Sequence, residues 1–143
     1  MSGLTRRAPA FSTLQSTHTP MSPDNPTGID SLEALRARLR EFVAERDWDQ
    51  FHNPKNLAMA LVAEAGELVE HFQWLTAEQA DRLPPETLAE VEHELADVFI
   101  FLVELADRLQ VDLLAAAARK LALNAQKYPV EKARGRATKY TKL

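Results

Sequence analysis

Apolar side chains recur every three or four residues from residue 32 onward, which is the spacing of an α-helix that buries one face. In the first such segment they are Leu32, Leu35, Leu39, Phe42 and Val43. Asp30 precedes this segment, and Glu33 stands three residues after Asp30, which is the spacing of a capping box. We therefore expect a first helix that begins after Asp30 and fades near residues 47–49.

Three further segments show the same helical spacing. Asn53 followed by Pro54 is typical of a helix start, as is Asp112, and Pro129 cannot continue a helix. Thr76 is placed to cap a short turn within the connection formed by residues 75–84. No segment alternates convincingly with a period of two, so we expect an all-α, four-helix-bundle domain. The three later helices are expected over about residues 54–74, 85–109 and 113–128.

The segment Val98–Val103 is apolar on every side of the third expected helix. Such a helix must be covered on more than one side, either inside a bundle or by another subunit. We therefore expect helix-mediated assembly into a homodimer or homotetramer. No apolar run approaches the length that spans a bilayer, so we expect a cytoplasmic protein without a membrane partner.

The length of 143 residues suits one domain, and the absence of cysteine excludes disulfides and thiolate chemistry. Residues 1–28 are rich in proline, serine and threonine, which predicts a disordered N-terminal tail before a domain at residues 29–143. The net charge of −4 hides a strong division along the chain. Residues 64–104 hold eleven acids and one base, whereas residues 105–143 hold three acids and nine bases.

Four acids within the acidic stretch stand in two i, i+3 pairs: Glu64 with Glu67, and Glu94 with Asp97. Each pair lies on one face of its helix, and antiparallel neighbours can bring the two faces together. Four such carboxylates repel one another unless a cation lies between them, and an all-oxygen site suits Mg²⁺, with Mn²⁺ as a second option. Gly66 between the first two acids favours a close approach to the backbone at this point.

Two other interpretations of these acids remain open. Either pair alone is common on an ordinary solvated helix face. A carboxylate-bridged di-iron bundle would need Glu-x-x-His on two helices, and the chain offers it only at Glu90–His93.

Aromatic and basic side chains cluster near the ends of the expected helices. Aromatic rings at such positions can stack on a planar base, and lysines can neutralise phosphates, although ordinary packing and solvated charge explain many such residues. The combination of a cation site, flat rings and positive charge describes a nucleoside polyphosphate bound through Mg²⁺. The candidate substrate-binding residues of these two kinds are Trp48, His52, Lys55, Trp74, Lys127 and Tyr128.

The acidic signature, Glu64-x-x-Glu67 and then Glu94-x-x-Asp97, resembles that of the all-α nucleoside triphosphate pyrophosphatases of the MazG-like superfamily. The segments 46–57, 70–74 and 124–130 resemble the dCTP pyrophosphatase branch, and the resemblance covers about residues 30–142. Lys55 and Lys127 depart from it by standing where arginine is usual, and Leu39 by standing where some members have histidine.

The resemblance implies Mg²⁺-dependent hydrolysis of a nucleoside triphosphate, with dCTP or a modified dCTP expected, to the monophosphate and pyrophosphate. It implies that Glu64, Glu67, Glu94 and Asp97 bind metal, and we expect Glu64 or Glu67 to activate water. It also implies that Trp48, His52 and Trp74 line the base and sugar, and that Asn124, Lys127 and Tyr128 contact the sugar and phosphates. We expect no nucleic acid polymer as a partner. Broader nucleotide specificity and a non-enzymatic helical interaction module remain the alternatives.

Overall fold

Helices α2 and α4 form the central pair of the molecule. The computed structural model describes residues 27–142, and every regular element in that range is helical. The all-α class is thus confirmed for the described part of the chain. The helices are α1 (Leu32–Glu45), α2 (Pro54–Glu70), α3 (Ala77–Ala80), α4 (Pro85–Arg108), α5 (Leu113–Lys127) and α6 (Val130–Ala133), followed by the 3₁₀ turn η1 (Tyr140–Lys142).

The helix starts follow local side-chain chemistry. Asn53 caps α2 by accepting a hydrogen bond from the Asn56 amide at 3.0 Å, and Asp112 caps α5 in the same way through Ala115. Thr76 opens α3 with a full capping box, as expected for a short turn there. The predicted cap of α1 is wrong by one residue, because Ser31 rather than Asp30 accepts the Ala34 amide.

Two helix ends also differ from expectation. Helix α2 stops at Glu70, and residues 71–74 continue as turns, so Trp74 follows the helix rather than ending it. The basic C-terminal segment contains α6 and η1, where the sequence pattern indicated no helix.

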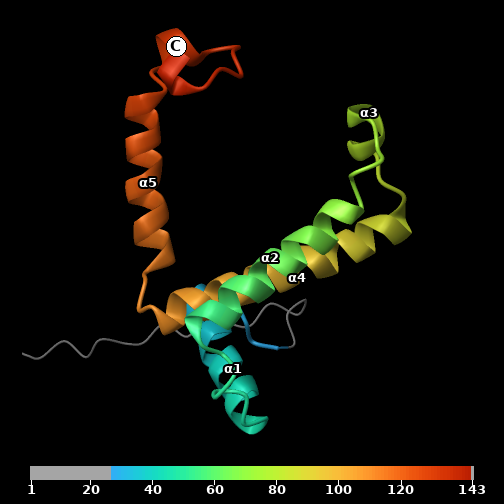
Figure 1. Ribbon diagram of the computed structural model, residues 1–143, viewed down its shortest axis with the longest axis vertical. Helices are drawn as coiled ribbons and strands as arrows, with labels where there is room; N and C mark the ends of the chain where they lie inside the picture. Colours follow the sequence, from blue (N-terminus) through green and yellow to red (C-terminus); the bar gives the residue numbers. More distant parts are fainter. Residues whose placement is uncertain (1–26, 143) are drawn as a thin grey trace, which may run out of the picture.

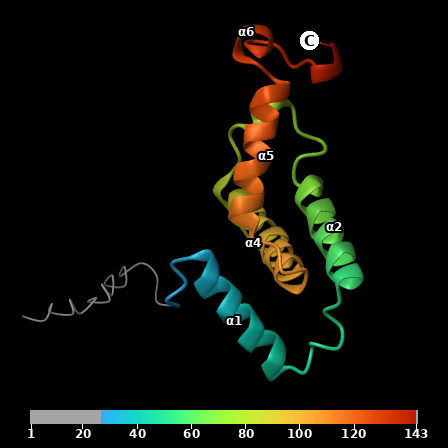
Figure 2. The same cartoon turned by 90° about the vertical axis from the view of Figure 1, so that its left-hand side faces the viewer.

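The core lies along the α2–α4 seam, where α1 crosses one end of the pair (Figures 1 and 2). Leu57 of α2 is 2% exposed and Val103 of α4 is fully buried, and Val43 joins them from α1. Val43, Leu57 and Val103 line one common region, so the buried positions of these three helices lie together at one end of the pair.

Helix α5 stands apart from the other three main helices (Figure 1). Within the described residues, only the α2–α4 and α1–α4 pairs pack extensively. The four expected helices are all present, but in a single chain they do not close into a compact bundle. The predicted assembly through helices is not tested by one chain.

Residues 27 and 28 are the only part of the predicted N-terminal tail that lies within the described range. Among the described residues, no helix has both the length and the apolar character needed to cross a membrane.

Candidate functional site

Acidic side chains from α2 and α4 face each other near the middle of the central pair. Glu64 of α2 and Glu94 and Asp97 of α4 each place a carboxylate oxygen within 4.8 Å of the other two. The three side chains are neither fully buried nor fully exposed. We call this set the acidic group, and it brings together three of the four acids that the spacing singled out.

The environment of Glu64 disfavours the charged form of its carboxyl. Burial, followed by repulsion from the Glu67, Asp97 and Glu94 carboxylates, raises the pKa of the Glu64 carboxyl. The Oε2 atom of Glu94 is buried and has no hydrogen-bond partner among the described residues. An unpartnered carboxylate oxygen beside two more carboxylates fits a hard divalent cation, whose preferred ligands are oxygens.

Glu67 lies one helical turn after Glu64 but is not a member of the close acidic group. Its side chain is exposed, and it still contributes to the repulsion that Glu64 experiences. The close approach predicted at Gly66 is not found within the chain, because a Cβ added there would meet no described atom within 4 Å.

Two of the predicted base-binding side chains meet before the start of α2. The Trp48 indole stacks on the His52 imidazole with ring centroids 6.1 Å apart and packs edge-on against Phe42 at 5.9 Å. Trp48 keeps 43% of its surface exposed, so one part of the ring remains open. This pairing is suited to presenting a flat aromatic surface to a ligand.

The other predicted side chains lie further away within one chain. Trp74 follows the opposite end of α2 from Trp48 and is 86% exposed. A helix of 17 residues is about 25 Å long, so one chain cannot place both indoles on the same base. Lys55 is exposed in the first turn of α2.

Asn124, Lys127 and Tyr128 gather at the C-terminal end of α5. The Tyr128 and Tyr140 rings pack edge to face with their centroids 5.8 Å apart, and the Lys127 Nζ lies 5.0 Å from the Tyr140 ring centroid. Because α5 stands apart, this cluster does not join the α2–α4 seam through extensive packing in the same chain.

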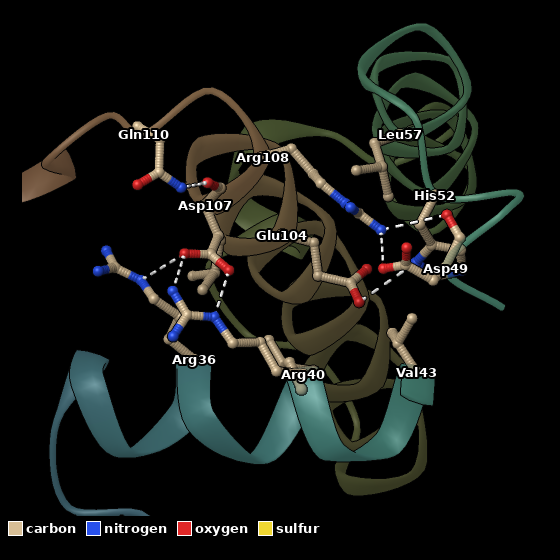
Figure 3. Close-up of a pocket in the computed structure, with 12 residues that line it drawn as sticks. Arg36, Arg40, Val43, Asp49, His52, Leu57, Glu104, Asp107, Arg108 and Gln110 are labelled. Carbon is tan, nitrogen blue, oxygen red and sulfur yellow. Dashed lines mark hydrogen bonds and ion pairs between the residues drawn. The ribbon is translucent and has the colours of Figure 1, made fainter. Parts of the chain in front are cut away.

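A charged cavity between α1, the α1–α2 loop and the end of α4 was missed by the sequence analysis (Figure 3). Arg40 forms a two-pronged hydrogen bond with Asp107 at 2.6 and 2.7 Å, and Arg36 approaches the same carboxylate at 3.4 Å. Hydrogen bonding to Arg40 lowers the pKa of Asp107 despite its partial burial. Arg108 pairs in turn with the Asp49 carboxylate.

Glu104 points into this cavity from α4 (Figure 3). Its Oε1 lies 3.4 Å from the Nδ1 of His52. One signal for Glu104 was available in the sequence, because it follows Asp97 by seven residues and therefore lies on the same helix face. The cavity partners could not be found that way, since Arg40 and Asp107 are 67 residues apart.

The chain is similar in sequence and in structure to known proteins. A sequence model described as the MazG-like family matches residues 59–143, which include the acidic group and α5. The chain belongs to the MazG-like family.

This MazG-like chain is 50% identical over 115 residues to dCTP pyrophosphatase 1 of Mus musculus and 47% identical to that of Homo sapiens. Each match covers 79% of this chain and 68% of the relative. A crystal structure of a pyrophosphatase from Archaeoglobus fulgidus superposes with a TM-score of 0.66 at 39% identity, covering 68% of this chain and 92% of that one. These similarities place the chain among the pyrophosphatases of the family, which are hydrolases.

Proposed function

We propose that this protein hydrolyses a deoxynucleoside triphosphate, dCTP or a modified dCTP, to the monophosphate and pyrophosphate with the help of Mg²⁺. The observation that carries the proposal is the convergence of three carboxylates from α2 and α4 within 4.8 Å. The similarity to dCTP pyrophosphatases supports the choice of substrate.

Glu64, Glu94 and Asp97 would hold the cation, with Glu67 as the fourth acid of the set. Mg²⁺ is the expected ion, and Mn²⁺ suits the same oxygen ligands. When bound, the ion supplies positive charge that offsets the charge on the phosphoryl oxygens. The raised pKa of Glu64 supports this assignment, because a cation relieves the repulsion responsible for part of the shift.

A carboxylate must also orient and deprotonate the attacking water. The expectation from the sequence left Glu64 and Glu67 as candidates. Glu67 is exposed and lies outside the close acidic group. These features favour Glu67 for this role, because its carboxylate is free to contact water. Water then attacks the α-phosphorus, pyrophosphate departs, and the proton passes to the carboxylate.

Trp48 and His52 would bind the base side of the nucleotide, since their stacked pair lies at the end of α2 that precedes the acidic group. Lys55 and Lys127 would neutralise phosphate charge as point charges, without the fork of an arginine. Trp74 would contact the base and sugar, and Asn124 and Tyr128 would contact the sugar and phosphates. A second copy of the chain would bring these distant side chains to the seam, which supports a homodimer or homotetramer over a monomer. A nucleic acid polymer is not expected as a partner.

A panel of nucleoside triphosphates incubated with Mg²⁺ tests the proposal by measuring pyrophosphate release. We expect release from dCTP to exceed release from the other nucleotides and to stop when EDTA removes the metal. Comparable release from all nucleotides would support the broader specificity instead. No release from any nucleotide, with no stabilisation by Mg²⁺, would indicate a non-enzymatic helical module.

A further inference from the structure

The charged cavity continues the α2–α4 seam beyond the acidic group. Glu64 and Asp97 belong to the acidic group, whereas Leu57 and Glu104 line the cavity. In each helix the cavity residue is seven residues from its acidic counterpart, and the two helices run in opposite directions. Seven residues make almost two full turns, so the cavity lies on the same seam about 10 Å from the acidic group.

A nucleotide whose phosphates rest at the acidic group can place its base in this cavity. The cavity has a volume of about 320 Å³, which lies within the range of small-molecule sites. Its apolar walls come from Leu39, Val43, Leu57 and Val103. His52 also lines it, and Trp48 stacks on the His52 imidazole. Apolar walls with a few convergent polar groups suit a heterocyclic base.

Glu104 differs from the other acids of the cavity in its partners. Asp107 is paired with Arg36 and Arg40, and Asp49 with Arg108. Glu104 has only His52 as an ion-pair partner among the described residues, at a distance longer than a strong hydrogen bond. Its side chain is 10% exposed, and burial raises the pKa of its carboxyl while His52 and Arg108 oppose that rise. A buried carboxylate with spare acceptor capacity is suited to a ligand that donates an N–H.

We propose that Glu104 determines base preference by accepting an N–H from the exocyclic 4-amino group of a cytosine base held in this cavity. A carboxylate acceptor is the usual side-chain partner of that amino group. Uracil and thymine carry a carbonyl at the same position, which would place two acceptors against each other in a buried site. The inference rests on the proposed pyrophosphatase function and names the group that selects its substrate.

The test compares the kcat/KM for dCTP with that for dUTP in the full-length protein and in Glu104→Gln. We expect the wild-type ratio to favour dCTP and to fall by about 10- to 100-fold in the variant, because the amide can also donate to the uracil carbonyl and a hydrogen bond to a charged group is lost. Glu92→Gln is the control. It makes the same Glu-to-Gln change on the same helix at an exposed position outside the cavity, and its dCTP-to-dUTP ratio should equal that of the wild type.

A second measurement needs no variant, in case Glu104→Gln does not fold. The wild-type protein should hydrolyse the 2-pyrimidinone analogue of dCTP, which lacks the 4-amino group, with a kcat/KM about 10- to 100-fold below that for dCTP. Equal rates for the two substrates, an absence of preference over dUTP, or an equal loss for both nucleotides in Glu104→Gln would overturn the role of Glu104. Hydrolysis of no nucleotide by the wild-type protein would instead remove the proposed function itself.

Discussion

Glu64, Glu94 and Asp97 show how residues of ordinary type become a candidate site through their neighbours. Each acid would be unremarkable on a solvated helix. Here a buried Glu94 oxygen has no hydrogen-bond partner among the described residues, and burial, followed by repulsion from Glu67, Asp97 and Glu94, disfavours ionisation of Glu64. Their identities and their spacing were readable from the sequence, because i, i+3 pairs share a helix face. The separation between Glu67 and the close group was not readable, since it depends on how the two helices are rotated against each other.

Glu67→Gln tests the division of labour among the acids. If Glu67 orients and deprotonates the attacking water, the variant should lose about 10²- to 10⁴-fold in kcat for dCTP, because an amide is not a base. Its circular dichroism spectrum should remain that of the wild type. Glu92→Gln, an exposed acid on α4 outside the acidic group, is the control and should keep its activity. Retained activity in Glu67→Gln would refute the role.

Asp107 provides a pH-dependent prediction at the same scale. Its pKa is lowered in the folded protein, chiefly by the Arg40 hydrogen bond, so its contribution to stability is complete above the unfolded value of 3.8 and disappears as the pH falls through the folded value. Asp107→Asn should therefore have a lower Tm than the wild type at about pH 6, and the difference should shrink toward about pH 3. A Tm difference that is constant across this range would show that the ion pair does not supply the stability.

At the scale of elements, the sequence predicts the helices well and their mutual placement poorly. Helices α4 and α5 begin and end within a residue or two of expectation because prolines and cap residues act locally. The position of α5 depends instead on which apolar faces find partners, and one chain supplies few of those partners. For the same reason the cavity, whose walls come from α1, α2, α4 and a loop, had no local signature.

The start of α1 gives a matched pair of substitutions at this scale. Ser31 accepts the Ala34 amide at 3.1 Å, so Ser31→Ala should lower the free energy of unfolding by about 1 kcal/mol through loss of the cap. Asp30→Ala should change it by less than about 0.5 kcal/mol, because Asp30 is exposed and is not the cap. Chemical denaturation of both variants measures the difference. A larger loss of unfolding free energy in Asp30→Ala than in Ser31→Ala would show that Asp30, the residue expected from the sequence, caps the helix.

For the whole molecule, the exposed apolar surface is the leading observation. Large apolar side chains remain open on the outward faces of α2, α4 and α5, among them Met59, Val62, Phe99, Leu114 and Leu121. Exposed large apolar side chains in such number are unusual for a monomeric protein, so we infer that further copies of the chain cover them. Such an assembly also offers a way to bring the end of α5 to the acidic group of another copy.

Mixing two inactive variants tests that arrangement. Glu64→Gln removes an acid of the acidic group, and Lys127→Met removes a charge at the end of α5, so each variant alone should hydrolyse dCTP very slowly. If these residues act together across subunits, unfolding and refolding the two variants together should restore activity, because some mixed assemblies contain one intact site. A matching mixture of Glu64→Gln with Asp97→Asn should stay inactive, since both acids belong to one chain's acidic group. A mass of 16.1 kDa in solution with full activity would contradict the assembly.

The central claim is that the acidic group holds a divalent cation for attack of water on the α-phosphorus of a deoxynucleoside triphosphate. Hydrolysis of dCTP in ¹⁸O-labelled water, followed by ³¹P NMR with Mg²⁺ and again with excess EDTA, tests it most directly. The account predicts labelled dCMP and unlabelled pyrophosphate with Mg²⁺, and no reaction with EDTA. Label in the pyrophosphate, release of orthophosphate with dCDP, or hydrolysis that continues in EDTA would contradict it.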